Sequence, residues 1–357
     1  MKKPYFDFVL LNQGNNSQDS LVYHLEDLKQ ELSRPELMVV KKANDWLKQA
    51  QERPIPAQLF GEFWFEGELC ILFSDTNLGK SILAVELAAS LSEGVSIPGF
   101  YLQGEPRTVL YLDFELSDKQ FEARYSENYT NHYHFSEHFF RAELEGDSTL
   151  EEGNNIEEQL FASLERALEF TKASVLIVDN ITYLRTETER ACHALPLMKE
   201  LKALKRKYNL SILSLAHTPK RDLGKPLTRN DLQGSKMLIN FCDSAFALGE
   251  SQQGVSLRYL KQIKARNTEV IYDGDNVCIC QIVKHGNKLR MEKLGYGPEE
   301  AHLRRFSEEE QLSKVKQVKQ MKQEGQSNVE IARRLGVSEG SIRNWLKREE
   351  GLKSDQS

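Results

Sequence analysis

The segment from Ser74 to Ser81 contains the groups that are needed to bind phosphate. Its residues in order are Ser74, Asp75, Thr76, Asn77, Leu78, Gly79, Lys80 and Ser81. In such a turn, successive backbone N–H groups and the start of the following helix cradle phosphate, lysine reaches the β- and γ-phosphates, and serine binds Mg²⁺. The usual pattern opens with glycine, whereas Ser74 holds that place here. An apolar run before the turn and a helical pattern after it favour a phosphate loop that binds ATP with Mg²⁺.

Carboxylates end two other apolar runs. SVLIVDN places Asp179 at the end of one predicted strand, and TVLYLDFEL places Asp113 and Glu115 at the end of another. Open α/β sheets bind their ligands at the carboxyl ends of the strands. Asp179 is predicted to bind Mg²⁺ together with Ser81. A carboxylate on the second strand could accept a proton from an attacking water, and the residues alone leave both Asp113 and Glu115 open.

The elements that position these side chains follow from the hydrophobic pattern. Between about residues 67 and 293, strands that are apolar throughout alternate with amphipathic helices. This pattern is typical of a parallel sheet that is covered on both faces, and the last apolar runs are spaced for antiparallel hairpins. The predicted fold class is α/β, with a mostly parallel sheet and antiparallel C-terminal strands. We expect a helical arm over residues 1–58, an ATPase domain over 59–295, a linker over 296–306 and a small all-α domain over 307–351.

The C-terminal region has the pattern of a helix-turn-helix. A capping box at Ser327 and Glu330 precedes VEIARRL, and a glycine turn leads to GSIRNWLKRE. The second helix would present polar side chains to base edges or phosphates of duplex DNA. These predicted DNA-binding residues are Ser341, Arg343, Asn344, Lys347 and Arg348. A three-helix module that docks on a protein is the alternative.

Taken together, these motifs resemble the RecA and DnaB branch of motor ATPases, in which an acidic residue ends the strand after the phosphate-loop helix. The chain looks most like the RepA-type hexameric helicase ATPases of plasmids and mobile elements, over about residues 60–293. The tail resembles the helix-turn-helix of resolvases. The resemblance implies that Glu115 is the catalytic glutamate and that His217, at the end of LSILSLAH, senses the γ-phosphate. It also implies that Lys264 and Arg266 reach into the site of a neighbouring subunit in a homo-oligomer, with six subunits expected.

Basic residues follow two of the predicted strands. In the resembled family, loops at these places line a central channel that holds single-stranded DNA. Here one loop carries Arg185 and Arg190. The other carries the predicted DNA-binding residues Lys220, Arg221, Lys225 and Arg229. Such side chains suit contacts with backbone phosphates without base readout, although basic loops are often only solvated.

Composition limits the class of protein. The chain has 357 residues, a net charge of −6 and 40% apolar residues. Its longest apolar runs are shorter than the roughly 18 residues that span a bilayer, and Pro4 and Asp7 interrupt the N-terminal segment. Five cysteines are spread along the chain and are expected to be reduced. We therefore expect a cytoplasmic protein without membrane partners.

Two classes of function fit these features. The first is an ATP-hydrolysing ring helicase or replication ATPase of a mobile genetic element. The second is a sequence-specific DNA-binding regulator in which ATP controls assembly. A recombination or transposition accessory ATPase, which loads or remodels a partner, is a third possibility.

Overall fold

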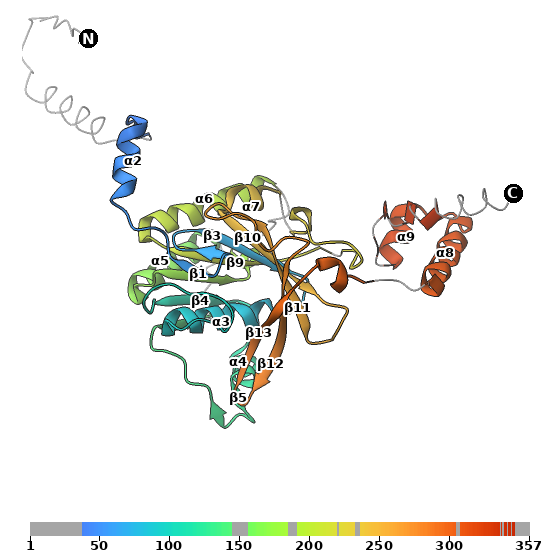
Figure 1. The fold of residues 1–357 in the computed structure, drawn as a ribbon, viewed down its shortest axis with the longest axis horizontal. Helices are drawn as coiled ribbons and strands as arrows, with labels where there is room; N and C mark the ends of the chain where they lie inside the picture. The colour runs from blue at the N-terminus through green and yellow to red at the C-terminus, as the bar shows by residue number, and fades with distance from the viewer. Residues whose placement is uncertain are drawn as a thin grey trace, which may run out of the picture. The chain divides into compact units, whose positions relative to one another are not determined.

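The structure is a computed structural model of the chain (Figure 1). It describes residues 38–144, 156–184, 191–219, 221–232, 236–304, 308–335, 337, 339–340, 342–343 and 345–346. The chain divides into two compact units, residues 1–55 and 56–357. In the first unit, the described part of the predicted arm forms helix α2, Ala43–Gln51.

A nine-stranded sheet forms the centre of the second unit. In spatial order its strands are β13 (Lys288–Gly297), β12 (Val277–His285), β11 (Leu257–Lys264), β10 (Ser244–Glu250), β3 (Leu69–Ser74), β9 (Ser211–His217), β8 (Val175–Asp179), β4 (Val109–Asp113) and β7 (Phe139–Ala142). The six strands from β10 to β7 pair in parallel, and β11, β12 and β13 pair antiparallel at one edge. The predicted fold class is therefore confirmed.

Two hydrophobic clusters cover the two faces of this sheet. Successive side chains of a strand point to opposite faces, so Ile71 of β3 packs in one cluster and Leu72 in the other. Helix α3 (Lys80–Glu93) covers the face of Leu72. Helices α5 (Ile156–Thr171), α6 (Ala191–Tyr208) and α7 (Lys236–Phe241) cover the face of Ile71 (Figure 1). Burial on both faces explains why β3 is apolar along nearly its whole length.

Shorter elements connect the main ones. They are β1 (Gln58–Phe60), β2 (Trp64–Phe65), α4 (Asp118–Arg124), β5 (Ser126–Glu127), β6 (Asn131–His132), η1 (Ile181–Tyr183), η2 (Arg229–Asp231) and η3 (Glu299–His302). Cys278 and Cys280 lie on one face of β12, and both thiols are free and buried, as are those of Cys70 and Cys242. Among the described helices, none is long and apolar enough to cross a membrane.

The tail forms its own small core. Helices α8 (Glu308–Gln323) and α9 (Asn328–Leu335) are followed by further helical residues at 342–343 and 345–346. Val318, Ile331, Ala332 and Ile342 are buried together, with Trp345 and other apolar side chains packed against them. The predicted capping box is present, because Ser327 and Glu330 each accept a hydrogen bond from the other's backbone N–H. Gly325, with φ of 86°, follows α8 in the left-handed region that favours glycine.

Candidate functional site

The predicted phosphate loop connects the end of β3 to the start of α3. Gly79 is the N-cap of α3 with φ of 99°, and a Cβ atom there would lie 2.6 Å from Ile282 Cδ1 of β12. A residue other than glycine would therefore be strained and would collide with β12. No side chain caps the N-terminus of α3, whose N–H groups can thus bind an anion.

Lys80 is buried at the start of α3 and lies against the loop that precedes it. Its ammonium donates to the carbonyl oxygens of Ser74, at 3.2 Å, and Asp75, at 3.3 Å. It also contacts Nδ1 of His217 at 3.0 Å. Burial lowers the pKa of Lys80, and the charges of Asp179, Glu115 and Asp75 oppose that change. The side chain is held where the sequence pattern places the β- and γ-phosphates.

His217 connects Lys80 to Glu115. Its Nε2 lies 3.1 Å from Glu115 Oε1, which also accepts a hydrogen bond from Asn180 Nδ2 at 3.2 Å. Both His217 contacts are satisfied when Nε2 carries the proton and donates to the carboxylate, while Nδ1 accepts from the ammonium. The hydrogen bond from His217 lowers the pKa of Glu115, the one from Asn180 adds to this, and burial opposes it. Glu115 is therefore ionised near neutral pH and can accept a proton.

Asp113, the alternative to Glu115, has a different environment. It is buried, its Oδ2 accepts from Arg141 Nε at 2.9 Å, and its Oδ1 accepts from the backbone N–H groups of Glu115 and Leu116. Arg141 also donates to the Leu116 carbonyl at 2.6 Å. Both Asp113 oxygens thus hold the turn after β4, and the geometry favours Glu115 as the base.

Asp179 lies at the end of β8, beside the start of α3. It is buried, and Tyr111 donates to its Oδ2 at 2.7 Å. Among the described residues Asp179 Oδ1 has no hydrogen-bond partner. The Ser81 hydroxyl lies close to the carboxylate and favours its ionised form. Burial raises the pKa of Asp179 to about 6, and the Ser81 and Tyr111 hydroxyls oppose this. A buried carboxylate oxygen without a partner beside a hydroxyl suits Mg²⁺, which takes oxygen ligands.

Lys264 and Arg266 lie at the end of the sheet that is opposite to the phosphate loop. Lys264 pairs with Ala245 at the start of β10, so it lies at the amino ends of the parallel strands. Its ammonium donates to three carbonyls at the end of α7, those of Ile239, Asn240 and Cys242. Arg266 is half exposed and pairs with Asp243 at 2.9 Å. Within one chain, these two side chains are therefore remote from Lys80.

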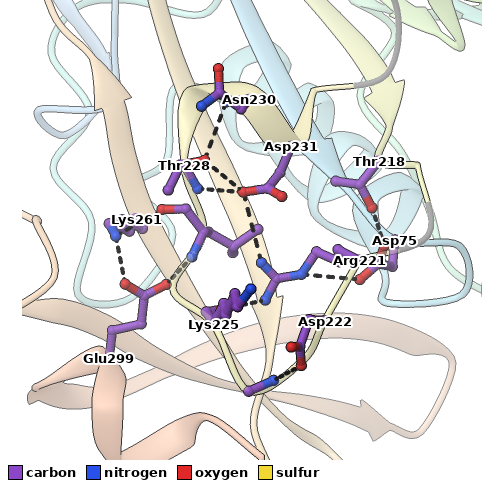
Figure 2. Close-up of polar contacts among 12 residues, drawn as sticks. Asp75, Thr218, Arg221, Asp222, Lys225, Thr228, Asn230, Asp231, Lys261 and Glu299 are labelled. Atoms are coloured by element: carbon purple, nitrogen blue, oxygen red, sulfur yellow. Dashed lines mark hydrogen bonds and ion pairs between the residues drawn. The ribbon is translucent and has the colours of Figure 1, made fainter. Parts of the chain in front are cut away.

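The loop after β9 is only partly as predicted. Lys220 lies outside the described residues, and Lys225 and Arg229 are exposed. Arg221 differs, because its side chain is only 7% exposed and lies between Asp75, at 3.8 Å, and Asp231, at 4.0 Å. Figure 2 shows that it points into the loop, where it donates to the Lys225 carbonyl. In this arrangement Arg221 is not presented to DNA.

Of the predicted DNA-binding residues in the tail, Arg343 is described. It is exposed and pairs with Glu339, four residues earlier, at 2.6 Å. Ser341, Asn344, Lys347 and Arg348 lie outside the described residues, as do Arg185 and Arg190.

Several residues of the site were not predicted from the sequence. Asn180 and Thr218 directly follow Asp179 and His217, which end two predicted strands. Their place next to a strand end is the sequence signal that could have identified them. Tyr111 and Arg258 are buried, and Arg258 Nε donates to the Leu78 carbonyl of the phosphate loop at 2.9 Å. Tyr111 lies on β4, two residues before Asp113 in the predicted strand, whereas Arg258 lies on β11, where no local motif marks it.

The predicted phosphate loop and the side chains around Lys80 thus lie together at the carboxyl ends of β3, β9, β8 and β4. A model of a family described as "AAA domain" matches residues 33–222, which is more than half of the chain. A helix-turn-helix family described as "Transposase" matches residues 301–357. Comparison with curated proteins found no match. Among solved structures, the crystal structure of a KaiC-like protein from Pyrococcus horikoshii OT3 is similar, with 14% identity and a TM-score of 0.41 over 64% of this chain and 91% of that one.

The chain therefore belongs to this AAA domain family, and it combines an α/β P-loop ATPase domain with a C-terminal helix-turn-helix.

Proposed function

We propose that this protein is an ATP-hydrolysing motor or replication ATPase of a mobile genetic element, which acts on DNA as a ring. The observation that carries the proposal is the connected set of Lys80 on α3, His217 on β9 and Glu115 in the turn after β4. A simple nucleotide-binding loop needs the lysine alone, whereas hydrolysis also needs a placed base. Glu115 supplies that base, and His217 joins it to the residue that holds phosphate.

Each side chain has a defined part in this proposal. The N–H groups of the phosphate loop and Lys80 bind the phosphates of ATP, while Ser81 and Asp179 bind Mg²⁺, which would neutralise charge on the phosphate oxygens. Glu115 orients a water and accepts its proton. His217 can contact either Lys80 or the γ-phosphate, so its hydrogen bond with Glu115 would respond to the nucleotide.

The proposed ring gives Lys264 and Arg266 a part at the site of a neighbouring chain. They lie at the amino ends of the parallel strands, whereas Lys80 lies at the carboxyl ends. They can therefore act on a nucleotide only if it is bound by a second chain. A ring of six in which each site is shared satisfies this requirement. Single-stranded DNA would pass along Lys225 and Arg229, and the tail would bind duplex DNA through residues that include Arg343.

Replacing Glu115 with glutamine tests the proposed hydrolysis. Glutamine keeps the size of the side chain but cannot accept the proton, so hydrolysis should fall about 10²- to 10⁴-fold. Binding of ATP, measured by calorimetry, should change little. Asp113→Asn is the matched comparison, and it should lower the melting temperature because the buried ion pair between Asp113 and Arg141 is lost. Full hydrolysis by the Glu115 variant would remove it from the mechanism.

The match of the tail to the Transposase family favours a second candidate, a transposition or recombination accessory ATPase. An ATP-switched, sequence-specific DNA-binding regulator is a further candidate. The two candidates differ from a helicase in their products. A helicase hydrolyses ATP faster with single-stranded DNA and displaces a strand from a forked duplex. DNA-stimulated hydrolysis without displacement would favour the accessory ATPase, and slow, DNA-independent hydrolysis with tight binding to one duplex sequence would favour the regulator.

A further inference from the structure

A carboxylate lies in the loop that is proposed to bind a polyanion. Asp75 directly follows β3, its carbonyl accepts a hydrogen bond from Lys80, and its charge is one of those that act on the Lys80 ammonium. Phosphate groups and a carboxylate repel each other, and the repulsion is strongest where water is partly excluded. The side chain is 27% exposed, so solvent screens it only in part. The loop therefore needs a means to neutralise Asp75.

The loop after β9 supplies that means. The Thr218 hydroxyl donates to Asp75 Oδ1, and Arg221 Nε lies 3.8 Å from Oδ2, so both carboxylate oxygens face residues of one loop (Figure 2). The Thr218 backbone N–H also donates to the Ser74 carbonyl at 3.0 Å. These contacts hold the side of the phosphate loop where Asp75 lies.

Arg221 is itself fixed from the other side. Its guanidinium lies 4.0 Å from Asp231 Oδ2, and it donates to the Lys225 carbonyl at 3.0 Å. Asp231 is held in turn by a capping box with Thr228. Arginine presents several donors in a rigid plane, so one guanidinium can pair with two carboxylates while it remains buried. Arg221 is thus held in place by several contacts, unlike the freely solvated side chain that a DNA-contacting loop would present.

We propose that Arg221 is a positioning residue of the ATP site. It acts through Asp75: it neutralises the carboxylate and keeps it turned away from the phosphates. The proposal rests on the proposed binding of ATP at Lys80, and it replaces the predicted role of Arg221 in DNA binding. The proposal has a specific consequence: the loss of nucleotide affinity on removal of Arg221 should depend on the charge of Asp75.

A double-mutant cycle tests that dependence. The full chain carries Arg221→Ala, Asp75→Asn or both, and the binding of Mg²⁺–ADP and Mg²⁺–ATPγS is measured by calorimetry. Removal of one partner leaves an uncompensated charge, so Arg221→Ala should raise the dissociation constant about tenfold. Asp75→Asn alone should lower it, because the loop then carries one negative charge fewer. The double variant should bind within about twofold of Asp75→Asn, because asparagine does not repel phosphate.

Controls separate this effect from a loss of structure. Arg221→Lys keeps the charge and should retain most of the affinity. Arg166→Ala removes an exposed arginine of α5, which contacts Ser163 of its own helix, and should change nothing. Thermal unfolding of each variant reports folding. If the double variant binds as weakly as Arg221→Ala, or if Arg221→Ala binds normally, the proposed role of Arg221 is wrong.

The same measurements distinguish this failure from a failure of the proposed function. If the wild-type chain binds neither nucleotide and Lys80→Ala makes no difference, ATP binding itself is wrong and the role of Arg221 falls with it. If the wild-type chain binds and Lys80→Ala does not, ATP binding stands, and the cycle alone decides the role of Arg221.

Discussion

The two sides of β3 contribute different kinds of residue to the phosphate loop. On the side of β9, β8 and β4, polar groups such as His217, Glu115 and Asp179 gather around Lys80. On the side of β10 to β13, Arg258 holds the Leu78 carbonyl and Ile282 packs against Gly79. Parallel strands end together, which gathers reactive groups, whereas the antiparallel strands brace the loop. We call these the reactive side and the supporting side.

The two sides therefore predict different consequences of mutation. Changes on the reactive side should alter turnover and leave folding intact, as expected for Glu115→Gln. Changes on the supporting side should alter the free energy of unfolding or its dependence on pH. The predictions below begin with the largest effect.

The largest effect should come from Arg266, which would complete the reactive side from another chain. An arginine that reaches into a neighbouring site contributes about 10³- to 10⁵-fold to hydrolysis, so Arg266→Ala should lose that factor. Its pairing with Asp243 is half exposed and is worth at most about 1 kcal/mol, so stability should hardly change. Mixing Arg266→Ala with Lys80→Ala chains should restore hydrolysis, because some sites then combine two intact halves.

Arg206→Ala, an exposed arginine of α6, is the control for loss of charge. It should keep wild-type hydrolysis alone and in mixtures. If no mixing ratio restores hydrolysis, Arg266 does not act between subunits, and the site is complete within one chain.

The reactive side could largely be predicted from the sequence, and the supporting side could not. Lys80, Asp179, Glu115 and His217 each follow an apolar run, and parallel strands bring such positions to one edge. Arg258 lies about 180 residues after Leu78, and Ile282 lies about 200 residues after Gly79, both on strands without a recognisable motif. Their contacts depend on the register of the antiparallel strands, which local patterns leave open. The sequence predicts that Arg221 contacts DNA, because a basic loop residue carries no sign that it will be buried.

Loss of Arg258 tests the supporting side. Its guanidinium is buried and donates to the carbonyls of Leu78, Val255 and Leu257. In Arg258→Met these carbonyls lose a donor, so the free energy of unfolding should fall by about 1–3 kcal/mol. Urea titration of the full chain measures this, with Arg166→Met as the control. At saturating ATP the rate of hydrolysis should change far less than in Glu115→Gln. A rate loss as large as that of Glu115→Gln, with unchanged stability, would show that the two sides are not separate.

Two glutamates make the most specific distinction between the sides. The hydrogen bond from His217 lowers the pKa of Glu115, whereas burial raises the pKa of Glu86 to about 7. Glu86 lies on α3, and its Oε2 accepts from the Met291 N–H of β13 at 2.7 Å. Lys288 and Arg290 on β13 partly offset the effect of burial, and Glu292 adds to it.

Because the folded chain favours protonated Glu86, its contribution to stability is complete below pH 4.5 and is lost as the pH rises through about 7. Each pH unit between these values is worth about 1.4 kcal/mol, so the total approaches about 3 kcal/mol. Glutamine resembles the protonated acid and can still accept from Met291. Glu86→Gln should therefore unfold at higher urea than the wild-type chain at pH 8 and match it near pH 4.5. An equal gain at both pH values would assign the effect to packing instead of titration. Glu115→Gln should leave this gap unchanged, since its titration lies at lower pH.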